Sequence, residues 1–372
     1  MTARHRLLHD WTRQVGALVP GARVTRTRTR ALFVLGVIWA GNVTLLKVAA
    51  TLPIAAADPS TEQRLRRWLA NPAVVVTELW RALLPALLAS RAGQDVLLVL
   101  DPTPQNDRAT ILARGLVCRR RVVPVAWRVV PQQEAWPQRQ IAYLRELFAE
   151  VAAALPAGCT VTVVGDRGLT GPAVIDACRA VGWRPLFRLS ADDRQGSMVR
   201  VAGGAERPVW ELVTGPGQRW AGRVALFKQA GWRTVELTIR WERGQDEPWL
   251  LLSDRPAGAA RVREYRRRAH AEATYADCKK RGWNIEASKV TILERFDRLL
   301  LVLHLAFWWS TQLGLRAIRR GERRRFDRAD RRDASVTRVG RAWLADRLDQ
   351  PKRRPPLPFR DAPTGWSFTW LA

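Results

Sequence analysis

Four residues that could act together on a phosphate backbone lie close in the sequence: Tyr265, Arg268, Glu272 and Lys279. If the segment 261–285 is one continuous helix, at about 100° per residue, all four project from a single narrow stripe. Two cations and an aromatic ring around a carboxylate suit a face that is laid against a polyanion. The plain alternative is a solvated basic helix in which Glu272 makes only an internal ion pair.

This spacing, with two, three and six residues between the successive members, resembles the signature of the insertion-sequence-four family of DDE transposases. The resemblance implies that Glu272 is the last of three metal-binding carboxylates. It also implies that Tyr265, Arg268 and Lys279 position DNA. We expect the tyrosine ring to stack on a displaced base, the guanidinium to grip a phosphate and the ammonium to lie near the scissile strand.

Two upstream aspartates each follow a short apolar run. The run 96–100 ends at Asp101 in a Leu-Asp-Pro-Thr sequence, and the run 160–164 is followed by Asp166 in Gly-Asp-Arg-Gly-Leu. Continuous apolar runs of this length are typical of buried central strands. With these two matches the resemblance covers roughly 96–290, and Pro102 is a mild departure that leaves the Asp101 carboxylate in place.

The order of the predicted elements indicates a mixed α/β fold with a ribonuclease-H-like core. The expected elements are strands at 96–100, 113–118 and 122–130, a helix at 137–155, a strand at 160–164, a helix at 172–181 and a strand at 184–189. In that fold the first and fourth strands lie side by side, so Asp101 and Asp166 should come within a few ångströms of each other. Such carboxylates repel unless they share divalent cations.

The rest of the chain is predicted to form further domains around this core. We expect an α-helical N-terminal domain at 1–92, core segments at 93–190 and 256–320, a β-rich insertion at 191–255 and a basic C-terminal tail at 321–372. Strands in the insertion are expected at 209–213, 223–227, 234–241 and 249–252. The family resemblance implies that the N-terminal domain binds DNA ends, and a helical cap without DNA contact is the alternative.

The composition favours a polyanionic partner. The chain has 372 residues, a formal net charge of +28 and a pI near 11.5. Nucleic acid is the simplest reason to tolerate such self-repulsion, although a genome that favours arginine would contribute. Arg266 and Lys280, beside the signature residues, are therefore counted among the DNA-binding residues.

The apolar runs 31–46 and 299–315 are interrupted by polar residues, and we expect buried core helices with no membrane partner. The four cysteines are scattered without the spacing of a metal site, which indicates free thiols in a reducing compartment. We expect a bacterial cytoplasmic protein associated with the nucleoid.

The function that these features predict is DNA transposition. Asp101, Asp166 and Glu272 would hold two Mg²⁺ ions, with Mn²⁺ as a substitute, for cleavage at the element's ends and strand transfer into target DNA. Partners would be double-stranded DNA, as terminal inverted repeats and target, and a second copy of the chain in the synaptic complex. A structure-specific nuclease of the same core and a catalytically inactive DNA-binding derivative are the alternatives.

Overall fold

The structure is a computed structural model. It describes residues 2–19, 21–134, 136–190, 198–201, 203–204, 206–279, 282–350 and 356–357, without the side chains of 136–138. The chain divides into two compact units. Among the described residues, the first consists of those up to Ser90, Pro104–Thr110 and those from Glu272 onward, and the second of Arg91–Thr103 and Ile111–Ala271.

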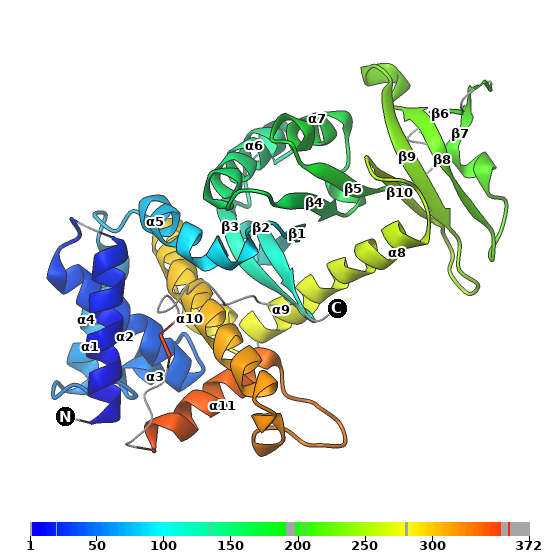
Figure 1. Cartoon of the computed structure of the whole chain (residues 1–372). Coiled ribbons are helices and arrows are strands. Elements are labelled where there is room, and N and C mark those ends of the chain that lie inside the picture. The colour runs from blue at the N-terminus through cyan, green and yellow to red at the C-terminus, as the bar shows by residue number, and fades with distance from the viewer. Residues whose placement is uncertain are drawn as a thin grey trace. The chain divides into compact units, whose positions relative to one another are not determined.

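A mixed sheet dominates the second unit (Figure 1). In the described part of the chain its ten strands follow the order β3-β2-β1-β4-β5-β10-β9-β8-β6-β7. The first five are β1 (Asp95–Gln105), β2 (Ala109–Cys118), β3 (Arg121–Pro131), β4 (Thr160–Gly165) and β5 (Arg184–Leu189). β4 lies between β1 and β5 and is parallel to both. This order confirms the predicted mixed α/β, ribonuclease-H-like arrangement with β1 and β4 as neighbours.

The pairing register places the two aspartates at equivalent positions. The last parallel pair of β1 and β4 is Leu100 with Gly165. Asp101, still within β1, and Asp166, the first residue after β4, therefore directly follow that pair. The sequence predicted that Asp101 ends its strand. In the structure β1 continues past it to Gln105. On its other side, β1 neighbours β2.

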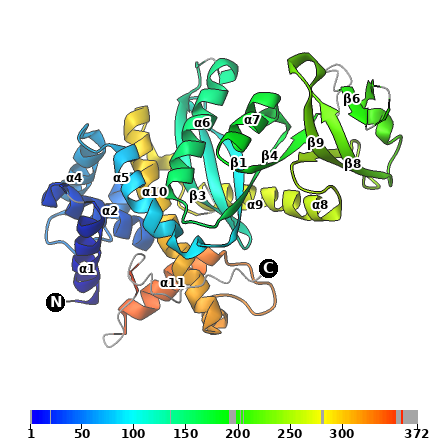
Figure 2. The ribbon, with the colours of Figure 1, turned by 45° about the horizontal axis from the view of Figure 1, so that its top comes forward.

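Two helices cover this part of the sheet: α6 (Trp136–Ala154) contacts β3, and α7 (Pro172–Ala180) contacts β5 (Figure 2). The buried face of α6 has helical spacing, since Leu144, Leu147, Phe148 and Val151 are fully buried. Both helices lie close to their predicted bounds.

The β-rich insertion extends the core sheet. Its strands are β6 (Met198–Val201), β7 (Glu206–Pro208), β8 (Arg219–Leu226), β9 (Arg233–Arg240) and β10 (Trp249–Ser253). β10 pairs in antiparallel fashion with both β5 and β9, which makes one continuous sheet. The strand predicted at 209–213 is wrong, because Val209–Leu212 forms a 3₁₀ turn. A short apolar run does not by itself distinguish these conformations.

The continuous helix predicted over 261–285 is also wrong. The segment forms α8 (Ala259–Arg266), a 3₁₀ turn at Arg267–Ala269 and α9 (His270–Cys278). After α9 the chain turns back, and the Trp283 N–H donates to the Asp277 carbonyl at 2.8 Å. A 3₁₀ turn has three residues per turn instead of 3.6, so the angles of a single helical wheel do not apply across it.

Helices form most of the first unit: α1 (Ala3–Leu18), α2 (Val24–Ala40), α3 (Leu45–Ala49), α4 (Asp58–Ala70), α5 (Val76–Leu88), α10 (Leu293–Arg319) and α11 (Val336–Leu348). Most of the two apolar runs lies buried in α2 and α10, as predicted. Among the described residues, no helix is both long and apolar enough to span a bilayer.

Helix α11 lies in the segment that the sequence indicated was a basic tail. It packs on α10 at two glycines: a Cβ on Gly314 would lie 1.9 Å from the Val336 carbonyl oxygen, and a Cβ on Gly340 would lie 1.9 Å from that of Ser310. The close backbone approach explains why small residues are required here. The arginines of this segment obscured its helical pattern.

Candidate active site

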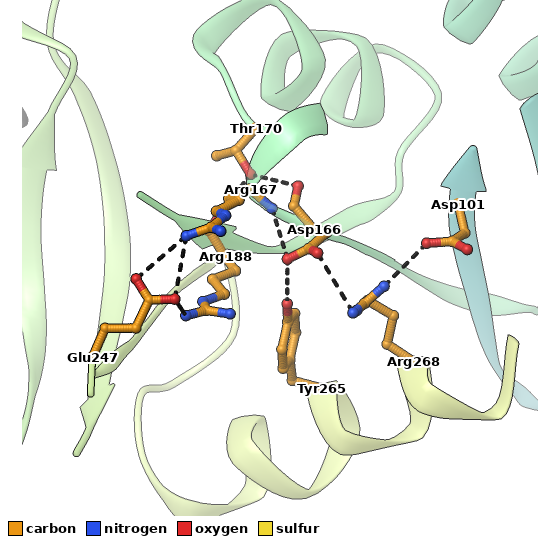
Figure 3. Close-up of polar contacts among 8 residues, drawn as sticks. All are labelled: Asp101, Asp166, Arg167, Thr170, Arg188, Glu247, Tyr265 and Arg268. Atoms are coloured by element: carbon orange, nitrogen blue, oxygen red, sulfur yellow. Dashed lines mark hydrogen bonds and ion pairs between the residues drawn. The ribbon is translucent and has the colours of Figure 1, made fainter. Parts of the chain in front are cut away.

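One guanidinium joins the two aspartates that follow the β1–β4 pairing (Figure 3). Arg268 Nη1 lies 3.0 Å from Asp101 Oδ1, and Arg268 Nη2 lies 3.5 Å from Asp166 Oδ2. The three side chains keep 21%, 16% and 34% of their surface exposed, respectively. Both carboxylates are therefore turned toward a single cationic position that solvent reaches.

The second oxygen of Asp166 is held by two neutral donors. Oδ1 accepts from the backbone N–H of Arg167 at 2.9 Å and from the hydroxyl of Tyr265 at 3.0 Å. Partial burial alone would raise the pKa of Asp166, but these hydrogen bonds, together with the charges of Arg268 and Arg188, lower it below its ordinary value. The Asp166 carboxylate is thus held ionised in a fixed orientation.

Tyr265 is a buried support for this carboxylate. Its ring is 4% exposed and packs in a cluster with Val164, Leu186, Leu251 and Val262. Trp249 meets the ring edge-on with 5.1 Å between centroids. Burial and the neighbouring Asp166 charge raise the pKa of the phenol, so it stays a hydrogen-bond donor. In this structure the ring is enclosed in the core, and the expectation that it stacks on a displaced base stays a prediction.

Gly165, the residue before Asp166, lets β4 pass close to a buried ring. A Cβ at this position would lie 2.5 Å from a ring carbon of Phe187 on β5. Thr170 lies just beyond Asp166, and its hydroxyl is 2.6 Å from the Arg188 carbonyl oxygen and 3.1 Å from that of Asp166. Packing and hydrogen bonding therefore fix the backbone on both sides of the aspartate.

Glu247, in the segment between β9 and β10, reaches back to the core. It pairs with Arg167 at 3.2 Å and with Arg188 on β5. Both arginines lie next to Asp166 (Figure 3). Sequence reasoning missed these three residues. Arg188 lies in a predicted strand and Arg167 follows the aspartate, but nothing in the sequence marks Glu247 as their partner.

The other predicted site residues lie in different surroundings. Glu272 is exposed in the first turn of α9 and belongs to the first unit. Lys279 Nζ donates to the Pro104 carbonyl at 3.3 Å and lies 3.4 Å from Glu286 Oε1. Arg266 pairs with Glu242. Lys280 lies outside the described residues.

The chemistry of the aspartate pair fits a divalent cation. Among the residues that the structure describes, no group of three or more His, Cys, Asp or Glu side chains is arranged to hold a metal ion. Asp101 and Asp166 nevertheless present hard oxygen donors to one shared cationic position, which is the donor type that Mg²⁺ and Mn²⁺ prefer. Whether Glu272 joins them stays a prediction.

Residues 139–309 match the family model described as "Transposase DDE domain". The matched DDE segment contains Asp166, Tyr265, Arg268, Glu272 and Lys279, and it begins after Asp101. The Arg268–Asp101 ion pair therefore joins a residue inside the DDE segment to a carboxylate outside it. The narrower assignment to the insertion-sequence-four family stays a prediction.

Two further proteins show partial likeness. The chain is 31% identical over 201 residues to tRNA(Ile)-lysidine synthase of Pseudomonas aeruginosa, a match that covers 45% of this chain and 43% of that protein. It thus spans less than half the length of this curated relative. A cryo-EM structure of a piggyBac transposase synaptic complex with hairpin DNA is similar over 93% of this chain and 80% of that one, at 10% identity. The TM-score of this match is 0.46.

Proposed function

We propose that this chain is a DNA transposase that cleaves the ends of a mobile element and joins them to target DNA. One observation carries the proposal: Asp101 and Asp166 directly follow the last paired residues of the neighbouring parallel strands β1 and β4, and both face one cation. The transposase DDE match of residues 139–309 supports the same reaction class. Within that class, the spacing from Tyr265 to Lys279 favours the insertion-sequence-four family.

Asp101, Asp166 and Glu272 would hold divalent cations, and the residues around Asp166 prepare it for that role. Two Mg²⁺ ions, or Mn²⁺ in their place, would offset phosphate charge and favour deprotonation of a water or 3′-hydroxyl nucleophile. Tyr265 and the Arg167 N–H orient the Asp166 carboxylate. Its lowered pKa keeps it charged at neutral pH. Hydrolysis and strand transfer would share this site because only the nucleophile differs.

Double-stranded DNA is the proposed partner, as terminal inverted repeats and as target. The net charge of +28 supports a polyanionic ligand. Arg266 and Lys279 would contribute phosphate contacts after leaving their present partners, Glu242 and Glu286. Because two element ends must be brought together, the working complex would contain at least two copies of the chain.

Strand transfer separates this proposal from a nuclease of the same core. The substrate would be a pair of pre-cleaved ends taken from the DNA that flanks the reading frame, incubated with a target plasmid and Mg²⁺. We expect covalent joining of the 3′ ends to the plasmid. Cleavage without joining would favour a structure-specific nuclease, and binding without either reaction would favour an inactive DNA-binding derivative.

Two substitutions distinguish metal binding by Glu272 from DNA binding by Lys279. Glu272→Gln should abolish nicking while end binding in Ca²⁺ persists or tightens, because a negative charge near the phosphates is removed. Lys279→Ala should weaken binding across sequences and lower the magnitude of the salt slope by about one unit. Near-normal nicking by Glu272→Gln would remove Glu272 from the proposed site.

A further inference from the structure

We propose that Arg268 is a displaceable counter-ion: it bridges Asp101 and Asp166 until a divalent cation takes its position, and it then pairs with a DNA phosphate. This inference rests on the proposed function, which makes the two aspartates metal ligands. In this order of events, the cation displaces Arg268 before Arg268 contacts DNA. Metal and DNA would bind cooperatively through this one side chain.

The Arg268 guanidinium contacts both aspartates. Its two terminal nitrogens reach different carboxylates, Asp101 at 3.0 Å and Asp166 at 3.5 Å. A planar fork suits such a double contact, and a lysine ammonium could not reproduce its geometry. The guanidinium therefore offsets the repulsion between two carboxylates at the ends of the β1–β4 pairing.

The two carboxylate oxygens of Asp166 have different partners. Oδ1 is held by the Tyr265 hydroxyl and the Arg167 N–H, whereas Oδ2 faces Arg268. Loss of the Arg268 contact would leave the two neutral donors in place, so the carboxylate would keep its orientation. A divalent cation carries twice the charge and approaches oxygen to about 2.1 Å, so it competes well for the same oxygens.

The location of Arg268 would keep a displaced guanidinium close to the site. It lies in the short 3₁₀ turn Arg267–Ala269 and its side chain is 21% exposed. A displaced guanidinium would remain beside the bound cation with its planar donors available to a phosphate. By thermodynamic linkage, a cation that releases Arg268 would strengthen DNA binding, and DNA would strengthen cation binding by the same factor.

Mn²⁺ binding to the full chain, measured by electron paramagnetic resonance of the free ion without DNA, tests the competition. Arg268→Gln should bind Mn²⁺ about tenfold more tightly than the parent, because the Arg268 guanidinium then no longer competes with the cation for the two aspartates. Arg263→Gln, the same charge change on an exposed α8 residue, is the matched control and should bind like the parent. Circular dichroism would verify that each variant is folded.

Arg268→Lys separates displacement from simple charge repulsion. This variant keeps the positive charge but loses the fork, so it should also bind Mn²⁺ more tightly than the parent. If Arg268→Lys binds Mn²⁺ as weakly as the parent, or if folded Arg268→Gln binds no more tightly than Arg263→Gln, the proposal is overturned.

A second experiment measures how cation binding affects DNA binding. Adding Ca²⁺ should tighten binding of a duplex oligonucleotide by the parent more than by Arg268→Gln, and equal tightening would contradict the phosphate step. These readouts require no catalysis. An absence of DNA cleavage by the parent would count against the proposed function while leaving the Mn²⁺ competition measurable.

Discussion

The Tyr265 hydroxyl donates a 3.0 Å hydrogen bond to Asp166 Oδ1, while the ring that carries it is buried among apolar side chains. Tyr265 therefore acts as a fixed support for a carboxylate. Its place in the signature spacing is explained by the geometry of α8, which presents the hydroxyl to Asp166 and, through the following 3₁₀ turn, Arg268 to both aspartates.

Tyr265→Phe should raise the pKa of Asp166, because one donor that stabilises its charged form is removed. Since the native pKa is lowered, the charged form contributes stability above the unfolded-state pKa, and this is lost as pH falls through the native value. The acid limb of a nicking pH profile should thus move to higher pH. Unfolding free energy should fall by about 1 kcal/mol. An unchanged acid limb would show that the hydroxyl does not tune Asp166.

Gly165→Ala should destabilise the sheet beside Asp166. The added Cβ would lie 2.5 Å from the Phe187 ring, so the expected loss is about 1–3 kcal/mol in urea unfolding. Gly168→Ala is the matched control, since nothing lies within 4 Å of its Cβ position. Equal losses in the two variants would contradict the packing argument.

Glu247→Gln should change DNA binding more than stability. Its ion pairs are partly exposed, so unfolding free energy should change by less than about 1 kcal/mol. Arg167 and Arg188, released beside Asp166, should tighten duplex binding in Ca²⁺ and steepen its salt dependence. The exposed Glu211 provides the control substitution, Glu211→Gln. Identical salt slopes for the two variants would show that the released arginines do not meet DNA.

Arg114→Met tests a buried cation outside the candidate site. Arg114 is fully buried, with its guanidinium carbon 3.7 Å and 4.8 Å from the ring centroids of Phe148 and Trp183. Its three side-chain nitrogens have no hydrogen-bond partner among the described residues, and burial lowers the pKa of Arg114 to about 9. Replacement by an apolar side chain should raise stability at pH 7 by about 1–4 kcal/mol.

The pH dependence of that gain has a definite sign. Between the native pKa of about 9 and the ordinary value of 12.5, the unfolded chain binds the proton more strongly, so parent stability rises with pH in that window. The advantage of Arg114→Met should therefore shrink above pH 9 in denaturant unfolding. Arg145→Met, at an exposed position on α6, is the control. A destabilised Arg114→Met would mean that ring stacking outweighs the cost of burial.

Sequence reasoning found the strands of the core because each is a short apolar run, and the fold order then placed Asp101 beside Asp166. The family resemblance assigned Tyr265 to DNA, and a helical wheel shows which residues share a stripe but not which of them are buried. The 3₁₀ turn at Arg267–Ala269 has no composition that distinguishes it from helix. Long-range pairs such as Arg268 with Asp101 depend on tertiary structure, so this ion pair could not be predicted from the sequence, although each residue had been assigned to the site.

Nicking of a supercoiled plasmid that carries the DNA flanking the reading frame tests whether Asp101 and Asp166 form the active site. The parent chain, Asp101→Asn, Asp166→Asn and Asp95→Asn would be compared in Mg²⁺. Asp95 begins β1 and pairs with Thr160, at the opposite end of the β1–β4 pairing, so it controls for a charge change on the same strand. We expect nicking by the parent and by Asp95→Asn, and background levels for Asp101→Asn and Asp166→Asn. Full activity in folded Asp101→Asn or Asp166→Asn would contradict the assignment of the active site.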